Sequence, residues 1–176
     1  GANTSQALLQ AKQYDQLESA VGYVLSLAKA GLDEIRASIF DLRPVVLQDQ
    51  GLIQAITTHA NALQIRHGIR VNAALCAEPE LPFQIKEEIY RIARESLHNI
   101  VKHAQATQVN LRLTCSEEMI ELHIEDNGIG FDPTKPHASL GLKSMRERAA
   151  SLKGTLTITS TPGAGTQIAA AIPLPH

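Results

Sequence analysis

The sequence contains no tryptophan, and only 3% of its residues are aromatic. Surfaces that stack nucleic-acid bases depend on aromatic side chains, so such a surface is not expected here. The chain also has little net charge, with 16 basic and 18 acidic residues giving a formal charge of −2. No basic stripe stands out, which leaves binding through counterion release with little support. We therefore expect no nucleic-acid partner.

Cysteine is scarce as well. Cys76 and Cys115 are the only two, they lie in different apolar segments, and neither belongs to a Cys-x-x-Cys motif. The pattern predicts two free thiols in a reducing compartment, with a buried structural role rather than a reactive one.

Long apolar runs are also missing. No segment reaches the length needed to span a bilayer, and no signal-peptide pattern opens the chain. We expect a cytoplasmic chain, associated with a membrane only through segments outside this sequence. Such a chain can be the cytosolic portion of a membrane-anchored sensor.

What the sequence does contain is periodicity. Its 176 residues are 44% hydrophobic, enough for one ordinary domain and a helical appendage. Residues 4–42 carry apolar side chains at intervals of three and four, and the helical region ends before Pro44. So long an amphipathic region needs a partner helix, which favours a homodimer formed through a helical hairpin. We place the helical region at residues 1–46 and the second domain at residues 47–176.

The second domain is predicted to mix helices and strands. The periodicity predicts helices at 51–65, 83–103 and 142–152, and strands at 69–75, 109–114, 119–125, 155–160 and 166–172. A loop rich in glycine and proline covers residues 127–140. The fold class is therefore α+β: a helical hairpin followed by a two-layer α/β sandwich with a mixed, mostly antiparallel sheet.

The helix at 83–103 carries a polar ridge. Glu95, Asn99 and His103 follow one another at intervals of four, and Lys102 lies beside them. Carboxylate and amide oxygens suit Mg²⁺ or the waters around it, while Lys102 and His103 offer donors for phosphate oxygens. The alternative is an ordinary solvated helix face, which the ridge alone does not exclude.

A second polar group follows the strand at 119–125. Asp126 ends an apolar-alternating run, and a buried carboxylate there can accept a hydrogen bond from the exocyclic amine of adenine. Gly128 and Gly130 remove side chains where the backbone must bend or approach a ligand. The alternative is a plain Asp-Asn-Gly turn between strands.

Two further glycine segments are weaker signals. Gly141 opens a helix whose free amides can bind phosphate, although it also fits an ordinary helix boundary. Residues 162–166, ending in Thr166, read as a hairpin turn. The order and spacing of all these segments carry more information than any one of them.

Together they resemble the Bergerat-fold, or GHKL, ATP-binding domain of gyrase, Hsp90, MutL and histidine kinases. The resemblance spans residues 51–173 and is strongest to the nitrate-sensing and membrane-thickness-sensing histidine kinases. The N box of that branch is similar to residues 95–104, its first G box to residues 126–131, and its last box to residues 163–166. The run Gly-Leu-Lys-Ser-Met-Arg-Glu-Arg-Ala at 141–149 and Asp-Leu-Arg-Pro at 41–44 are typical of the branch.

The resemblance implies ATP or ADP as ligand, Mg²⁺ as cofactor, and a response regulator receiver domain as partner. It implies that Glu95 acts at the γ-phosphate and, with Asn99, at the metal, while Lys102 and His103 contact phosphates. It implies that Asp126 binds the adenine amine with support from Thr166 through water. It implies that the cofactor is also bound by Gly128, Gly130, Gly141, Leu142 and Met145, and that the three glycines among them act as hinges and line the lid.

One feature departs from the family pattern. The phosphorylated histidine of these kinases lies on the first hairpin helix, whereas all seven histidines here follow Pro44. We expect the acceptor to lie outside this chain, so that the chain binds ATP without phosphorylating itself. The competing hypothesis is a nucleotide-gated module of the same fold, such as an anti-sigma serine kinase or a conformational ATPase.

Overall fold

The computed structural model describes residues 45–133 and 140–174, together with Val21 and Leu25. Most of the expected helical region at 4–42 and residues 134–139 of the expected loop lie outside the described residues. From Val45 onward the chain forms one compact unit. No helix among the described residues is long and apolar enough to cross a membrane.

The unit is built on a five-stranded sheet in the order β1-β2-β3-β5-β4. Strand β1 pairs with β2 in parallel, and the other three pairings are antiparallel. The prediction of a mixed, mostly antiparallel sheet is confirmed. The strands are β1 (Arg70–Leu75), β2 (Gln108–Cys115), β3 (Met119–Asp126), β4 (Thr155–Ser160) and β5 (Thr166–Pro173).

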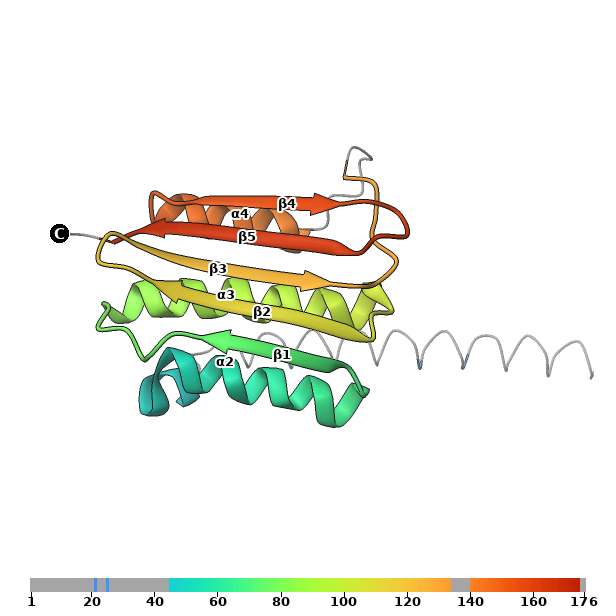
Figure 1. Ribbon diagram of the computed structural model, residues 1–176, viewed down its shortest axis with the longest axis horizontal. Coiled ribbons are helices and arrows are strands. Elements are labelled where there is room, and N and C mark those ends of the chain that lie inside the picture. The colour runs from blue at the N-terminus through green and yellow to red at the C-terminus, as the bar shows by residue number, and fades with distance from the viewer. Residues whose placement is uncertain (1–20, 22–24, 26–44, 134–139, 175–176) are drawn as a thin grey trace, which may run out of the picture. The chain divides into compact units, whose positions relative to one another are not determined.

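The helices lie behind one face of this sheet and complete a two-layer sandwich (Figure 1). They are α2 (Val45–His67), α3 (Phe83–Asn99) with the π-helical turn η1 (Ile100–Ala104), and α4 (Leu140–Ser151). Alternation along the strands turns one set of side chains toward α3, where they join the apolar stripe of that helix. The central members of this core are Ile89, Ile92, Leu97, Leu111, Leu122 and Ile124, each at most 2% exposed.

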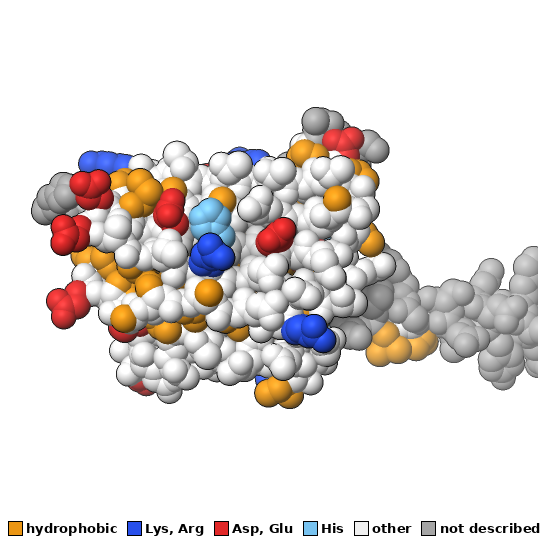
Figure 2. Space-filling view, viewed as in Figure 1, with side chains coloured by type: hydrophobic (Ala, Val, Ile, Leu, Met, Phe, Trp, Pro, Cys, Tyr) orange, Lys and Arg blue, Asp and Glu red, His pale blue; other side chains and the backbone are white. Residues whose placement is uncertain are grey.

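No element among the described residues covers the other face of the sheet. Polar side chains from β1, β2, β3 and β5 line it, as alternation requires: Asn72, Asn110, Arg112, Glu121, His123, Glu125 and Gln167. Figure 2 shows acidic and basic side chains scattered over this face, without a continuous field of one sign.

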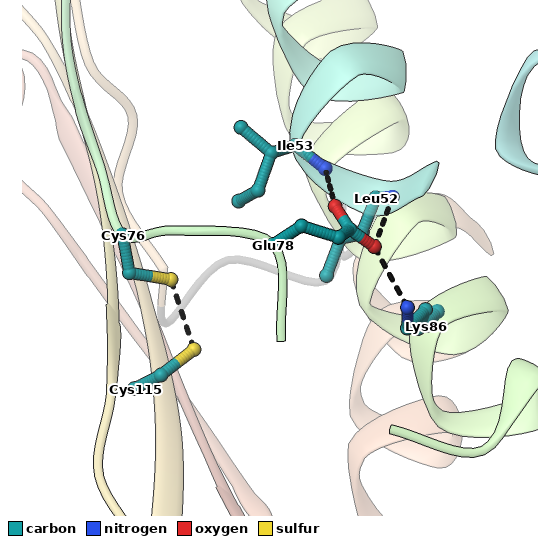
Figure 3. Close-up of polar contacts among 6 residues, drawn as sticks. All are labelled: Leu52, Ile53, Cys76, Glu78, Lys86 and Cys115. Atoms are coloured by element: carbon teal, nitrogen blue, oxygen red, sulfur yellow. Dashed lines mark hydrogen bonds and ion pairs between the residues drawn. The ribbon is translucent and has the colours of Figure 1, made fainter. Parts of the chain in front are cut away.

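A single carboxylate joins α2 to the start of α3. Helix α2 is kinked at Gly51, whose φ of 84° frees the next amides from the helical ladder. The Glu78 carboxylate accepts hydrogen bonds from the amides of Leu52 (3.0 Å) and Ile53 (2.8 Å) and pairs with Lys86 at 2.7 Å (Figure 3). Although burial opposes it, these donors hold the pKa of Glu78 below its usual value.

The prediction of one regular helix over 83–103 is wrong in its last turn. Regular α-helix ends at Asn99, and Ile100–Ala104 form a π turn that ends at Gln105, whose φ is 52°. Because a π turn is wider than an α turn, the four-residue spacing no longer places His103 directly above Asn99. Glu95 and Asn99 remain neighbours on α3.

The cysteines also differ from expectation. Both thiols are free, as predicted, but Cys115 is exposed and Cys76 only partly buried. The prediction of a buried structural role is therefore wrong for Cys115. The two residues come from segments 39 positions apart, yet their sulfur atoms lie 2.9 Å from each other.

Candidate functional site

Asp126 ends β3 at the side of the sheet where η1 and the β4–β5 turn meet. Its side chain is only 5% exposed, as the sequence predicted for a strand terminus. The carboxylate accepts a hydrogen bond from the Gly128 amide at 2.8 Å, and the Thr166 amide also bonds to it. Burial raises the pKa of Asp126 above its usual value, and these two amides oppose the rise.

The loop after Asp126 packs closely against η1 at Gly128. A Cβ on Gly128 would overlap the carbonyl oxygen of Ala104, the last residue of η1. That carbonyl accepts a hydrogen bond from the next amide, Ile129, at 2.8 Å, and the Gly163 amide donates to the Ile129 carbonyl at 2.7 Å. The loop is therefore fixed between the end of η1 and the β4–β5 turn.

Ser160 is a residue of this site that the sequence analysis missed. Its hydroxyl lies 2.9 Å from that of Thr166, accepts a hydrogen bond from the Phe131 amide at 2.9 Å, and donates to the Gly165 carbonyl at 3.0 Å. A small polar residue at the end of a strand, directly opposite Thr166 across a hairpin, was the available signal. Ser160 ties the hydroxyl of Thr166 to the loop.

Asn127 is the second missed residue. Its side-chain oxygen accepts hydrogen bonds from the amides of Thr107 and Gln108, both at 2.9 Å, and its amide nitrogen donates to the Thr107 hydroxyl at 2.9 Å. The side chain thereby holds the loop to the start of β2. Because the partner residues lie 19 and 20 positions away in the sequence, these bonds are tertiary contacts and not a local Asx turn.

Glu95, Asn99 and Gly141 form a second cluster. The Asn99 amide nitrogen donates to the Glu95 carboxylate at 3.4 Å, as expected for neighbours on one helix face. Gly141, in the first turn of α4, lies so close that a Cβ there would overlap the same carboxylate oxygen. The fold thus brings the start of α4 against the polar ridge of α3, which sequence spacing alone did not require.

The remaining predicted site residues divide between surface and core. Lys102 and His103 lie on η1 and are exposed. Leu142 and Met145 are 9% and 0% exposed, and the Met145 sulfur accepts a hydrogen bond from Ser96 at 3.3 Å. These two side chains hold α4 against α3 and present almost no surface to a ligand.

Gly130 tests how tightly the loop is packed. Its φ is +58°, and a Cβ there would overlap the carbonyl oxygen of Thr161. The sequence alone suggests that Gly130→Ala spares the fold, but this contact leads us to expect a loss of about 2 kcal/mol or more in unfolding free energy. Urea denaturation measures it.

Gly163→Ala is the matched control for Gly130→Ala. Gly163 also has a positive φ, +82°, but nothing lies within 4 Å of a Cβ placed there. The Gly163→Ala variant should lose only the cost of an alanine at positive φ, about 1 kcal/mol of unfolding free energy. Equal losses of unfolding free energy in the two variants would mean that the overlap between an added Cβ at position 130 and the Thr161 carbonyl does not destabilise the fold.

Comparison with known proteins identifies the family. Residues 84–176 match the family described as histidine kinase-, DNA gyrase B- and HSP90-like ATPases. This chain belongs to that ATPase family. The match covers α3, the loop after β3, α4 and the last hairpin, and so includes every predicted site residue. The sequence-based assignment to the ATP-binding fold of histidine kinases, gyrase and Hsp90 is confirmed.

Several sensor kinases resemble this ATPase domain in sequence. The signal transduction histidine-protein kinase/phosphatase DegS of Brevibacillus brevis is 33% identical over 165 residues, covering 93% of this chain and 43% of DegS. The sensor protein VraS of Staphylococcus saprophyticus is 37% identical over 142 residues, covering 80% of this chain and 41% of VraS. The chain therefore spans less than half the length of these relatives.

Solved structures agree on the fold. The histidine kinase domain of the blue-light activated kinase of Erythrobacter litoralis superposes with a TM-score of 0.59 at 25% identity, over 70% of this chain and 63% of that one. The histidine kinase AdeS of Acinetobacter baumannii gives 0.61 at 15% identity, over 82% and 81% of the two chains. The open, mostly antiparallel sheet covered by helices is common to this ATPase domain and its kinase neighbours.

Proposed function

We propose that this chain is the catalytic portion of a sensor histidine kinase, which transfers the γ-phosphoryl group of ATP to a histidine for relay to a response regulator aspartate. One observation carries the proposal. The buried Asp126 carboxylate and the Glu95–Asn99 ridge belong to segments that meet where Ala104 bonds to the loop after β3. A purine and a triphosphate are joined through a ribose, so a site for both needs two such groups held in a fixed relation.

Asp126 is proposed to bind the purine. Its carboxylate accepts from the exocyclic amine of adenine, whereas the carbonyl of guanine would face it as a second acceptor. The hydroxyl of Thr166, held by Ser160 at 2.9 Å, is proposed to support the base through a water molecule. Gly128 is proposed to let the loop lie against the Ala104 carbonyl, which holds the backbone beside Asp126 in place.

The ridge of α3 is proposed to hold Mg²⁺ and the phosphates. No group of three or more His, Cys, Asp or Glu side chains within the described ranges is arranged to bind a metal by itself. Mg²⁺ fits nonetheless, because it takes one or two protein oxygens and completes its shell with phosphates and water. Asn99 donates its amide nitrogen to Glu95, which leaves its oxygen available. When bound, the metal offsets negative charge on the transferring phosphoryl group.

The remaining site residues are proposed to act around the phosphates. Lys102 and His103 are exposed on η1, where their donors can reach phosphate oxygens. Gly130 and Gly141 border the segment proposed to act as a lid, and Gly141 lets the first turn of α4 approach Glu95. Leu142 and Met145 are proposed to anchor that turn from the core side.

Membership in the nitrate-sensing and membrane-thickness-sensing branch is a finer proposal. The run at 141–149 and the Asp-Leu-Arg-Pro segment at 41–44 support it. We also propose that residues 1–46 belong to a dimerisation hairpin and that the kinase works as a homodimer. Domain boundaries at 46 and 47 follow from that assignment.

Phosphorylation of the longer protein tests the proposal. A version extended upstream to include the acceptor helix, incubated with ATP and Mg²⁺, should acquire phosphate that is labile in acid and stable in base. The phosphate should then pass to a receiver-domain aspartate. Steady ATP hydrolysis without a phosphohistidine, or phosphate on a partner's serine, would instead favour a conformational ATPase or an anti-sigma serine kinase.

Asn99→Ala should separate metal-dependent from metal-free binding. If Asn99 holds Mg²⁺, removing its oxygen should reduce the Mg²⁺-dependent gain in ATP affinity by about tenfold, while affinity in EDTA changes little. Calorimetric titration with a non-hydrolysable ATP analogue measures the dissociation constant with Mg²⁺ and the dissociation constant in EDTA. Lys102→Ala is the contrast, since loss of a phosphate donor should weaken binding in both conditions. If Asn99→Ala weakened binding equally with and without Mg²⁺, as expected for Lys102→Ala, Asn99 would not be a metal ligand.

A further inference from the structure

Two thiols lie together at the end of the sheet away from Asp126. Cys76 directly follows β1 and its amide donates to the Leu113 carbonyl at 2.9 Å, while Cys115 is the last residue of β2. Their side chains point toward each other, with the sulfur atoms 2.9 Å apart (Figure 3). The sequence contains no other cysteine, so the chain can form one intramolecular disulfide and no alternative pairing.

We propose that Cys76 and Cys115 are a redox pair that forms a reversible disulfide with a low-molecular-weight disulfide, such as oxidised glutathione, as oxidant. The sulfurs of a disulfide are about 2.05 Å apart, so the two atoms need to approach by less than about 1 Å. Cys115 is exposed and Cys76 partly so, which gives the oxidant access. The last registered pair of β1 and β2, Leu75 with Leu113, lies one residue before Cys76 and two before Cys115, so the two backbones are already held near each other.

The reaction is two successive thiol–disulfide exchanges. The Cys76 thiolate attacks the oxidant, forming a mixed disulfide and releasing one small thiol. Cys115 then loses its proton, attacks the Cys76 sulfur and releases the second small thiol, so that two protein thiols and one small disulfide become one protein disulfide and two small thiols. Partial desolvation, together with the hydrogen bond and charge of the neighbouring Cys76, raises the pKa of Cys115 to about 12. The raised pKa slows this second exchange at neutral pH, whereas the closeness of the two sulfur atoms favours it.

The disulfide would fasten the connection between β1 and α3. Only two residues after Cys76, Glu78 holds the Leu52 and Ile53 amides of α2 and the Lys86 side chain of α3 (Figure 3). Oxidation would therefore fix the end of β1, two residues before the carboxylate that joins α2 to α3. The loop closed by residues 76–115 includes all of α3, η1 and β2, so the unfolded chain loses much conformational freedom.

Formation of the disulfide should not change the proposed nucleotide site directly. Cys115 pairs with Ile120 at one end of the β2–β3 ladder, and Val109 pairs with Asp126 at the other. At about 3.3 Å per residue, the two ends are roughly 20 Å apart along the strands. Oxidation is expected to change resistance to unfolding while leaving affinity for an ATP analogue within about twofold.

Equilibration with mixtures of reduced and oxidised glutathione tests the pair. After acid quenching and alkylation, mass spectrometry of the oxidised chain should show the loss of two hydrogen atoms, no alkylated cysteine, and one cross-linked peptide containing Cys76 and Cys115. Non-reducing electrophoresis should show a monomer. The melting temperature should rise by roughly 5–15 °C and return to its starting value with dithiothreitol.

Cys76→Ser and Cys115→Ser are the matched controls, because each removes one sulfur and keeps a similar shape. Neither should gain thermal stability from oxidised glutathione, and each should form only a mixed disulfide on its remaining cysteine. Two alkylatable thiols at the most oxidising ratio, a covalent dimer between chains, or an intramolecular disulfide with no rise in melting temperature would each overturn the proposal.

Discussion

Asp126→Asn should weaken binding of ATP analogues by about 10- to 100-fold, the effect of replacing a buried acceptor that faces the adenine amine. Asparagine keeps one oxygen, so the hydrogen bond from the Gly128 amide can persist. Its amide nitrogen, however, presents a donor where the carboxylate presented an acceptor. Calorimetry or fluorescence titration with the purified chain measures the change in dissociation constant.

A measurement of unfolding free energy distinguishes a loss of ATP-analogue affinity from a loss of the folded state. Because burial raises the pKa of Asp126, replacing the charged carboxylate with a neutral amide removes an unfavourable buried charge, which offsets part of the cost of losing one acceptor oxygen for the amides of Gly128 and Thr166. The unfolding free energy should therefore change by less than about 2 kcal/mol. Glu125→Gln is the matched control: it removes a charge one residue earlier, on the open face of the sheet. It should leave affinity within about twofold. Equal losses of affinity in the two variants would show that charge near the strand end, rather than contact with the base, matters.

His59 should make the fold sensitive to mild acid. It lies on α2, and burial, followed by the nearby charges of Arg94, His98 and Arg66, lowers its pKa from 6.5 to about 4. Between these values the unfolded chain binds a proton that the folded chain does not, so unfolding free energy falls as pH falls. The loss should total about 3 kcal/mol by pH 4, since one pKa unit corresponds to about 1.4 kcal/mol.

Urea denaturation from pH 7 to pH 4 measures this dependence. In His59→Gln the slope between pH 6.5 and 4 should be shallower by one proton, whatever its stability at pH 7. His67→Gln, which replaces an exposed histidine at the end of the same helix, should keep the steep slope. An unchanged slope in His59→Gln would mean that this histidine takes up its proton equally in both states.

The predicted elements agree well with the fold where the pattern is local. The strand at 155–160 has the predicted bounds, and strands 119–126 and 166–173 differ by one residue. Alternation of apolar and polar residues is itself the consequence of one buried and one open face, so the pattern contains this information. The burial of Asp126 followed in the same way from its place after Ile120, Leu122 and Ile124.

Other features have no local signal. A π turn after Asn99 depends on how the helix end meets the loop at Gly128, and periodicity over 83–103 resembles that of a regular helix. Met145 was assigned by motif to the ligand, whereas packing places it beside Ser96 in the core. Ser160 and Asn127 connect segments that only the fold brings together.

The sequence by itself determined the α+β class, the order of the elements and the chemical groups of the candidate site, because each follows from residue type and short-range period. Only the tertiary structure decided that β1 runs parallel to β2, that Gly141 lies against Glu95, and that Cys76 meets Cys115. These are pairings between segments dozens of residues apart. They follow from how the strands and helices pack around a common core, which neither segment encodes alone.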